Sequence, residues 1–110
     1  MDISQIVMLS FIPIEISRTA SSGTWSFNTD RISGADLRQI VVVATTATTT
    51  FDLSITDDKD NVVLDIDGIT GSYGSDPDDL LYLPMRGVYT VAVANASVDE
   101  AFTGRLLLEA

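Results

Sequence analysis

The side chains best suited to chemistry in this chain are carboxylates, and they concentrate in one stretch. Calcium binds several oxygen ligands on a flexible loop, so one hypothesis is a cation site that makes stability depend on calcium. The helix-loop-helix calcium pattern fails, however, because its third ligand position counted from Asp58 is Val62 and no glycine or distant glutamate follows in register. We therefore expect solvated turn carboxylates and no metal site. Half of the sixteen acids lie in this stretch: Asp57, Asp58, Asp60, Asp65, Asp67, Asp76, Asp78 and Asp79.

Two of these carboxylates could act as a pair. Asp65 and Asp67 are two residues apart, so in a strand they share one face, and paired carboxylates flank the scissile bond in glycosidases. The chain has one tryptophan and three tyrosines, too few to indicate an aromatic-lined sugar cleft. It has no histidine, no cysteine and a single lysine, so its hydroxyl groups lack an obvious activating base. The residues predict a protein that is not an enzyme, with no catalytic residue and no cofactor.

Exposed aromatic rings could instead bind sugar. Trp25, Tyr73 and Tyr82 are the candidates, and Tyr73 stands in a glycine-flanked loop. Core packing is favoured for Trp25, while Tyr73 stays open between ligand contact and a plain turn. We expect Tyr89 to pack inside with its hydroxyl on a backbone group. The glycosylation triplet that starts at Asn95 is interpreted as a turn, since asparagine favours the hydrogen bonds of turns.

Composition and charge narrow the class of protein. Apolar residues reach 45%, enough for one domain over residues 1–110. The net charge of −10 repels phosphate backbones, so nucleic acid is not expected as a partner. The absence of cysteine favours assembly in a reducing cytosol. The apolar run Ile6 to Ile14 is flanked by Asp2 and Glu15 and is too short to span a membrane, so we expect a strand and no membrane partner.

Hydrophobic alternation positions these residues on strands. Short segments of period two separated by polar turns predict an all-β antiparallel sandwich, jelly-roll or immunoglobulin-like, with about eight strands and no substantial helix. The turn at residues 57–61 is expected to close a hairpin, with loops at 67–79 and a break at 84–87. The expected strands include residues 3–17, 24–27, 39–44, 51–55, 62–66, 80–83, 88–94 and 102–108.

The first half of the chain carries three further expectations. Residues 29–37 are expected to form a loop that turns at Gly34, with at most one helical turn near Ala35. The unbroken apolar run Gln39 to Ala44 favours a central strand covered on both faces. Pro13 cannot donate to a sheet, so it indicates an edge strand or a bulge.

The N-terminal strand is the segment expected to contact a neighbouring subunit. It is apolar on both faces in its first half, which fits either a contact with another chain or a central place in its own sandwich. The candidate partner-binding residues are Ile6, Val7, Met8, Leu9 and Phe11, together with Tyr73.

Several segments resemble small β-sandwich structural proteins of tailed bacteriophage particles. The resemblance covers residues 39–109 and is carried by Thr50–Asp57, Asn61–Asp65, Leu83–Val91, Asn95–Ser97 and Phe102–Leu106. A looser resemblance links the Gly-x-Tyr-Thr-Val strand at Gly87 to jelly-roll-like domains beside secreted bacterial peptidases. Neither transfers a binding residue.

What the phage resemblance implies is a virion component assembled in the host cytoplasm. The expected role is that of a capsid decoration (cement) protein, a homo-oligomer whose partner is the major capsid protein or another virion protein. A tail, neck or fibre-attachment component is the alternative within the virion. A carbohydrate- or cell-surface-binding module is the alternative outside it.

Overall fold

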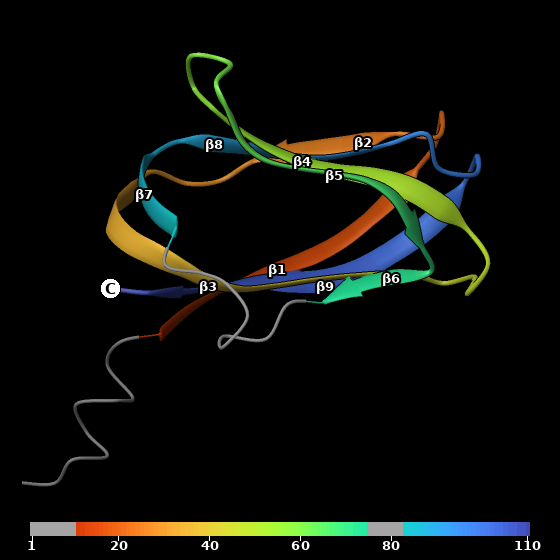
Figure 1. The fold of residues 1–110 in the computed structure, drawn as a ribbon, viewed down its shortest axis with the longest axis horizontal. Helices are drawn as coiled ribbons and strands as arrows, with labels where there is room; N and C mark the ends of the chain where they lie inside the picture. Colours follow the sequence, from red (N-terminus) through yellow and green to blue (C-terminus); the bar gives the residue numbers. More distant parts are fainter. Residues whose placement is uncertain (1–10, 75–82) are drawn as a thin grey trace, which may run out of the picture.

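The computed structural model describes residues 11–74 and 83–110, which fold into two antiparallel sheets without a helix (Figure 1). The predicted all-β sandwich is confirmed, with nine strands in these residues where the sequence predicted about eight. No helix in this part of the chain could cross a membrane. The strands are β1 (Phe11–Ala20), β2 (Trp25–Asn28), β3 (Ile32–Ala44), β4 (Thr50–Asp57), β5 (Val62–Thr70), β6 (Ser72–Gly74), β7 (Leu83–Gly87), β8 (Tyr89–Ala94) and β9 (Glu100–Glu109).

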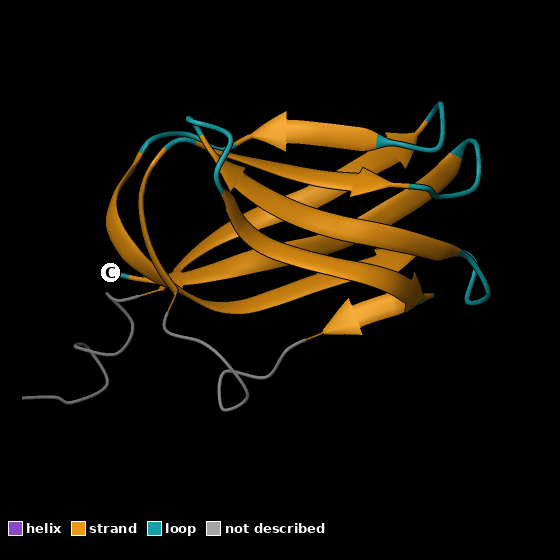
Figure 2. Ribbon diagram, turned by 45° about the horizontal axis from the view of Figure 1, so that its top comes forward, coloured by secondary structure: helices purple, strands orange, loops and turns teal. Residues whose placement is uncertain are grey.

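The two sheets are built from strands that are distant in sequence. Sheet A has the order β1-β9-β3-β6, with β7 also paired to β3, and sheet B has the order β2-β8-β4-β5. Figure 2 shows the two layers crossing each other, with loops only at the two ends. Because β1 pairs with β9 alone among the described strands, Pro13 lies at a sheet edge, as predicted.

The core lies between the sheets and consists of the alternate side chains of each strand. In β4 and β8 the alternation predicted from sequence is the alternation observed, because every second residue is buried. The ring of Phe102 meets Phe51 edge-on at 5.0 Å and Trp25 at 5.9 Å. The largest fully buried side chains are Phe51, Phe102, Leu37, Ile40, Leu53, Ile55, Met85, Leu106, Leu108, Val42, Val91 and Val93.

Two segments predicted as breaks are strands. Residues 32–37, expected as a loop with a helical turn, are the first half of β3 and pair with β7. A bulge between Ile32 and Ala35 contains Gly34 at φ 142°, so the glycine bends the strand and does not end it. Residues 83–87 form β7, where Pro84 is tolerated because β7 pairs with one strand only in the described part of the chain.

The expected loop at 67–79 is also corrected where the structure describes it. Strand β5 continues to Thr70 and β6 follows at Ser72, because Gly68 and Gly71 adopt the left-handed conformation that a corner needs. The hairpin at 57–61 is confirmed, and the carboxylate of Asp57 accepts hydrogen bonds from the backbone of Lys59 and Asn61.

Two other predictions were wrong in part. The run Gln39 to Ala44 is central in sheet A but is buried on one face only, and Val43 is 38% exposed. The first strand is described over residues 11–20, and residues 3–10 of the predicted range 3–17 lie outside the described residues.

Candidate partner-binding surface

The outer face of sheet A carries apolar side chains that the core does not use. Strand pairing places three rows across β1, β9 and β3, and we call this surface the sheet A face. Its rows are Pro13–Leu107–Gln39, Glu15–Arg105–Val41 and Ser17–Thr103–Val43. Val41 and Leu107 are half-buried, and Val43 and Pro13 are exposed. The result is a broad, mixed surface on three adjacent strands.

Charge on the sheet A face is balanced. The Arg105 guanidinium donates to Gln39 Oε1 at 3.1 Å, and Arg38 donates to Glu109 Oε1 at 2.7 Å beside it. Within the three rows Arg105 offsets Glu15, so the rows carry no net charge; in the next row Arg38 offsets Glu109, and Asp36 adds one acid. A neutral surface of this kind can approach another protein without the repulsion expected from a chain of net charge −10.

The outer face of sheet B has a different character, and we call it the sheet B face. Its rows pair Asp52 with Ala94, Ser54 with Asp65 and Ala92, and Thr56 with Thr90 and Val62, whose side chain is 64% exposed. The charged side chains in these rows are carboxylates. The two faces therefore differ in charge and in apolar content: the rows of sheet A present several apolar side chains with offset charges, and the rows of sheet B present hydroxyls and acids with the single large apolar side chain of Val62.

The acids of sheet B lie close enough to affect one another. The charge of Asp65, its hydrogen bond and the charge of Asp52 together raise the pKa of Asp67. Asp52 behaves differently, because hydrogen bonds from the Gly68 N–H at 2.9 Å and from Asn95 Nδ2 lower its pKa. The predicted Asp65–Asp67 pair is thus brought together. No group of three acids in the described residues is placed to hold a metal ion, and Asp76, Asp78 and Asp79 lie outside them.

These shifts predict opposite effects for two matched substitutions. Asp52 has a folded-state pKa below its ordinary value near 3.8, so its contribution to stability is present above that value and lost as pH falls through the lowered pKa. Asp67 has a raised pKa, so its contribution is present at low pH and lost as pH rises through that pKa. At neutral pH we expect Asp52→Asn to lower the free energy of unfolding and Asp67→Asn to raise it.

Urea unfolding at neutral and acid pH measures both effects. The difference in free energy of unfolding between the two variants should narrow in acid, where the carboxyls of Asp52 and Asp67 are both protonated in the native protein. If Asp67→Asn destabilised the neutral protein as much as Asp52→Asn does, the assigned origin of the shifts would be wrong.

A groove lies at one end of sheet A, between the start of β1 and the start of β3. Its volume is about 300 Å³. Apolar side chains from β1, β3 and β9 form most of its wall, and Asp30 and Arg31 lie at its rim. Ile12 contributes to this wall and is 47% exposed. We call it the end groove; it is lined by Ile12, Pro13, Ile14, Asp30, Arg31, Ile32, Ser33, Gly34, Ala35, Leu108 and Ala110.

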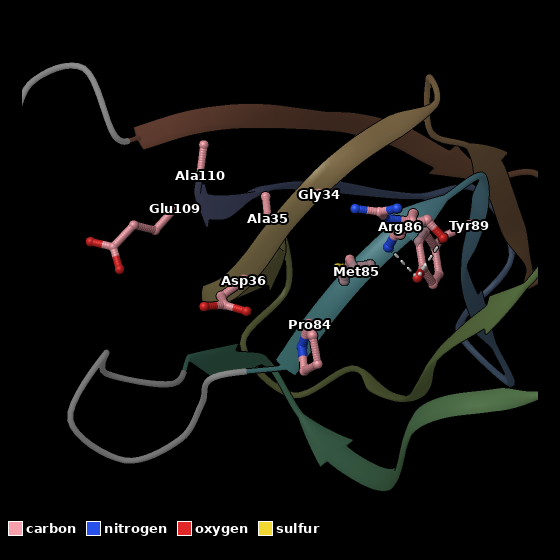
Figure 3. A pocket seen from close by; sticks show the side chains of 9 residues that line it. All are labelled: Gly34, Ala35, Asp36, Pro84, Met85, Arg86, Tyr89, Glu109 and Ala110. Carbon is pink, nitrogen blue, oxygen red and sulfur yellow. Dashed lines mark hydrogen bonds between the residues drawn. The ribbon is translucent and has the colours of Figure 1, made fainter.

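A second cavity of about 430 Å³ adjoins β3 and β7, and Figure 3 shows its lining residues. The hydroxyl of Tyr89 donates to Arg86 O at 3.1 Å and accepts from Arg86 N at 2.7 Å, which confirms the prediction for Tyr89. In Figure 3 the carboxylates of Asp36 and Glu109 lie on the side away from Arg86. The charged groups that line this cavity therefore do not converge on one point.

The structure places only some of the predicted site residues. Ile6, Val7, Met8 and Leu9 lie outside the described residues, and Phe11 begins β1 opposite Glu109. Tyr73 lies in β6 opposite Val42, is half-buried and packs against the core.

The remaining aromatic and turn predictions have clear outcomes. Trp25 is 6% exposed, so core packing is confirmed and its ring is not a platform for sugar. Asn95 has φ 57° and its amide donates to Asp52, which confirms the predicted turn. Tyr82 lies outside the described residues.

The residues of the sheet A face were missed by sequence reasoning. Val41 and Val43 belong to the unbroken apolar run Gln39 to Ala44, which was interpreted as burial on both faces, and Leu107 belongs to a second apolar run in the last strand. An unbroken run at the centre of a sheet also fits an exposed apolar face, and that signal was present in the sequence.

Comparison with known proteins gives only distant likeness. No protein-family model matches the chain, and no curated protein matches it in sequence. The VP2 subviral particle of infectious bursal disease virus has a similar structure, with a TM-score of 0.40 and 16% identity over 90% of this chain. A structure of the Gx strain of that virus is similar with a TM-score of 0.37 and 15% identity over 90% of this chain. The chain spans 32% of each of these proteins. A TM-score of this size assigns neither a family nor a role.

Proposed function

We propose that this chain is a non-enzymatic structural protein of a virion, most specifically a phage capsid decoration protein that binds the shell through its sheet A face. The observation that carries the proposal is the difference between the two outer faces. The sheet A face presents Val41, Val43 and Leu107 between offset charges, and the sheet B face presents acids and hydroxyls with Val62 on β5. One face is thus suited to a protein partner and the other to water.

The physical properties of the sheet A face fit a partner of this kind. Three long strands present a continuous surface, and a standard interface needs about 800 Å² from each partner. Burial of exposed aliphatic side chains would supply the favourable free energy of binding, at about 25 cal/mol for each Å² of apolar surface removed from water. Many copies on a repeating shell would gain further from avidity.

The finer parts of the proposal rest on the sequence resemblance. The segments of residues 39–109 quoted above resemble phage sandwich proteins. Most of their residues lie in β4, β5, β7, β8 and β9, so the segments belong to both sheets. A site on the tail or neck would use the same face against a different partner. Localisation of the protein on intact particles by electron microscopy separates these alternatives.

The decisive experiment compares two identical substitutions on opposite sheets. Val43→Glu places a charge on the sheet A face, and Val62→Glu places the same charge on β5, where the native side chain is 64% exposed. Each protein is mixed with expanded, undecorated capsids of the same virus, and the bound fraction is measured by sedimentation. We expect Val43→Glu to weaken binding by about tenfold or more and Val62→Glu to bind as the native protein does.

Two results would contradict the proposal. The first is failure of the native protein to bind or stabilise capsids. The second is equal loss of binding in both variants, which would show that added negative charge, and not the sheet A face, decides the contact. Circular dichroism of both variants checks that each one is folded.

A further inference from the structure

The end groove exists because β9 separates β1 from β3 over only part of their length. The last paired row is Phe11–Glu109–Asp36, and beyond it β3 curves away towards β7 (Figure 1). Residues 32–35 of β3 pair with β7 on one side. On their other side no strand of the described chain pairs with them. An unpaired strand segment therefore borders an apolar groove, which is the arrangement that accepts an added strand.

The lining of the groove is apolar and carries no net charge. Ile12, Ile14, Ile32 and Leu108 line it, and its two charged lining residues, Asp30 and Arg31, offset each other. Two copies of a chain with net charge −10 repel each other over most of their surface. The end groove is a place where part of a second copy can approach without that repulsion.

The ten residues that precede β1 have matching properties. They contain one charge, at Asp2, and five aliphatic or thioether side chains after it: Ile3, Ile6, Val7, Met8 and Leu9. They join β1 at Phe11, next to the groove wall at Ile12. Ten extended residues span about 33 Å, which is long enough to reach a neighbouring molecule.

We propose that residues 3–9 of one copy bind in the end groove of a second copy, as a strand added beside residues 32–35. The proposal identifies the segment and the surface through which the chain self-associates. It does not depend on a role in a virion, since it uses the end groove and not the sheet A face.

Exchange between copies is favoured over insertion into the chain's own groove. In the chain's own groove, Glu109 at the end of β9 lies between Phe11 and Asp36, with Ala110 after it, so the segment would have to step sideways across the end of β9 to reach residues 32–35. A segment that continues into a neighbouring molecule needs no such sideways step, which is the geometry of exchanged elements in symmetric dimers.

The test uses the full chain with a change on each side of the contact. The segment variant carries Ile6→Asp and Met8→Asp, the groove variant carries Ile12→Glu, and the control carries Val98→Glu, where the native side chain is 68% exposed in a turn far along the chain. The control adds the same charge as the groove variant. Light scattering after size-exclusion chromatography over a dilution series gives the dissociation constant of self-association.

We expect the native protein and the Val98→Glu control to self-associate alike. The segment and groove variants should each raise the dissociation constant by about thirtyfold or more, the effect of losing one strong contact in an interface. An equimolar mixture of the two variants should recover association, because the intact segment of one variant fits the intact groove of the other.

Each alternative outcome overturns the proposal. A monomeric native protein would overturn it, as would association that survives both variants. Variants that dissociate singly and do not associate when mixed would show that the segment of one copy does not bind the groove of another. The Val43→Glu protein should still self-associate. Failure of the native protein to bind capsids, with its self-association intact, identifies a failure of the virion proposal alone.

Discussion

Substitution of Gly104 by alanine is expected to lower the free energy of unfolding by about 3 kcal/mol, and Tm by roughly 15 °C. Gly104 lies in β9, between Ile16 of β1 and Val42 of β3. A Cβ added there would overlap the carbonyl oxygen of Val41 and come within 2.8 Å of its carbonyl carbon. These are backbone atoms of a paired strand, so they cannot move without disturbing the centre of sheet A.

Gly74→Ala is the matched control for this prediction. Gly74 also lies in a strand of sheet A, it does not have a positive φ, and a Cβ added there meets nothing within 4 Å. We expect Gly74→Ala to change the free energy of unfolding by no more than about 1 kcal/mol. Thermal and urea unfolding of both variants measures the difference. Equal stability of the two variants would mean that the strands of sheet A are not packed as described.

Loss of the Phe102 ring is expected to cost about 3–5 kcal/mol. The Phe102 ring is 1% exposed. It contacts Phe51 of β4 and Trp25 of β2, so it links β9 of sheet A to two strands of sheet B. Phe102→Ala would remove both edge-on contacts and leave a cavity between the sheets. The measurement is urea unfolding followed by far-ultraviolet circular dichroism.

Phe102→Leu separates volume from aromatic geometry. It keeps most of the apolar volume and loses the edge-on ring contacts, so we expect a smaller loss of about 1.5 kcal/mol. Trp25 fluorescence should change in both variants, because Trp25 lies 5.9 Å from the Phe102 ring. A loss below about 1 kcal/mol for Phe102→Ala would contradict its central place in the core.

The sequence predicts the fold best where each strand has one buried face and one face exposed to solvent. In Phe51-Asp52-Leu53-Ser54-Ile55 the alternation identifies both the strand and its buried side chains, and the same holds for Tyr89 to Val93. The prediction fails where a residue that usually interrupts a strand lies in a part of the sheet that accommodates it. Pro84 is accepted in an edge strand and Gly34 in a bulge, and neither circumstance is visible in a single segment.

The binding surface is harder to predict because it is assembled from distant segments. The row Glu15–Arg105–Val41 joins residues from the beginning, the end and the middle of the chain. No local pattern records which strands are neighbours, so the apolar run around Val41 was interpreted as burial. The acid pair at Asp65 and Asp67 was predictable because it needs only the two-residue period of one strand.

The position of β9 in sheet A has a consequence for synthesis. It is the last described strand to leave the ribosome, yet it lies between β1 and β3, which emerge first. Until residues 100–109 are translated, β1 and β3 lack their shared hydrogen-bonding neighbour. Each then exposes an unpaired backbone edge that can pair with another chain. A nascent chain stalled before Glu100 should therefore recruit chaperones or aggregate, and its folding should be completed by the arrival of a single strand.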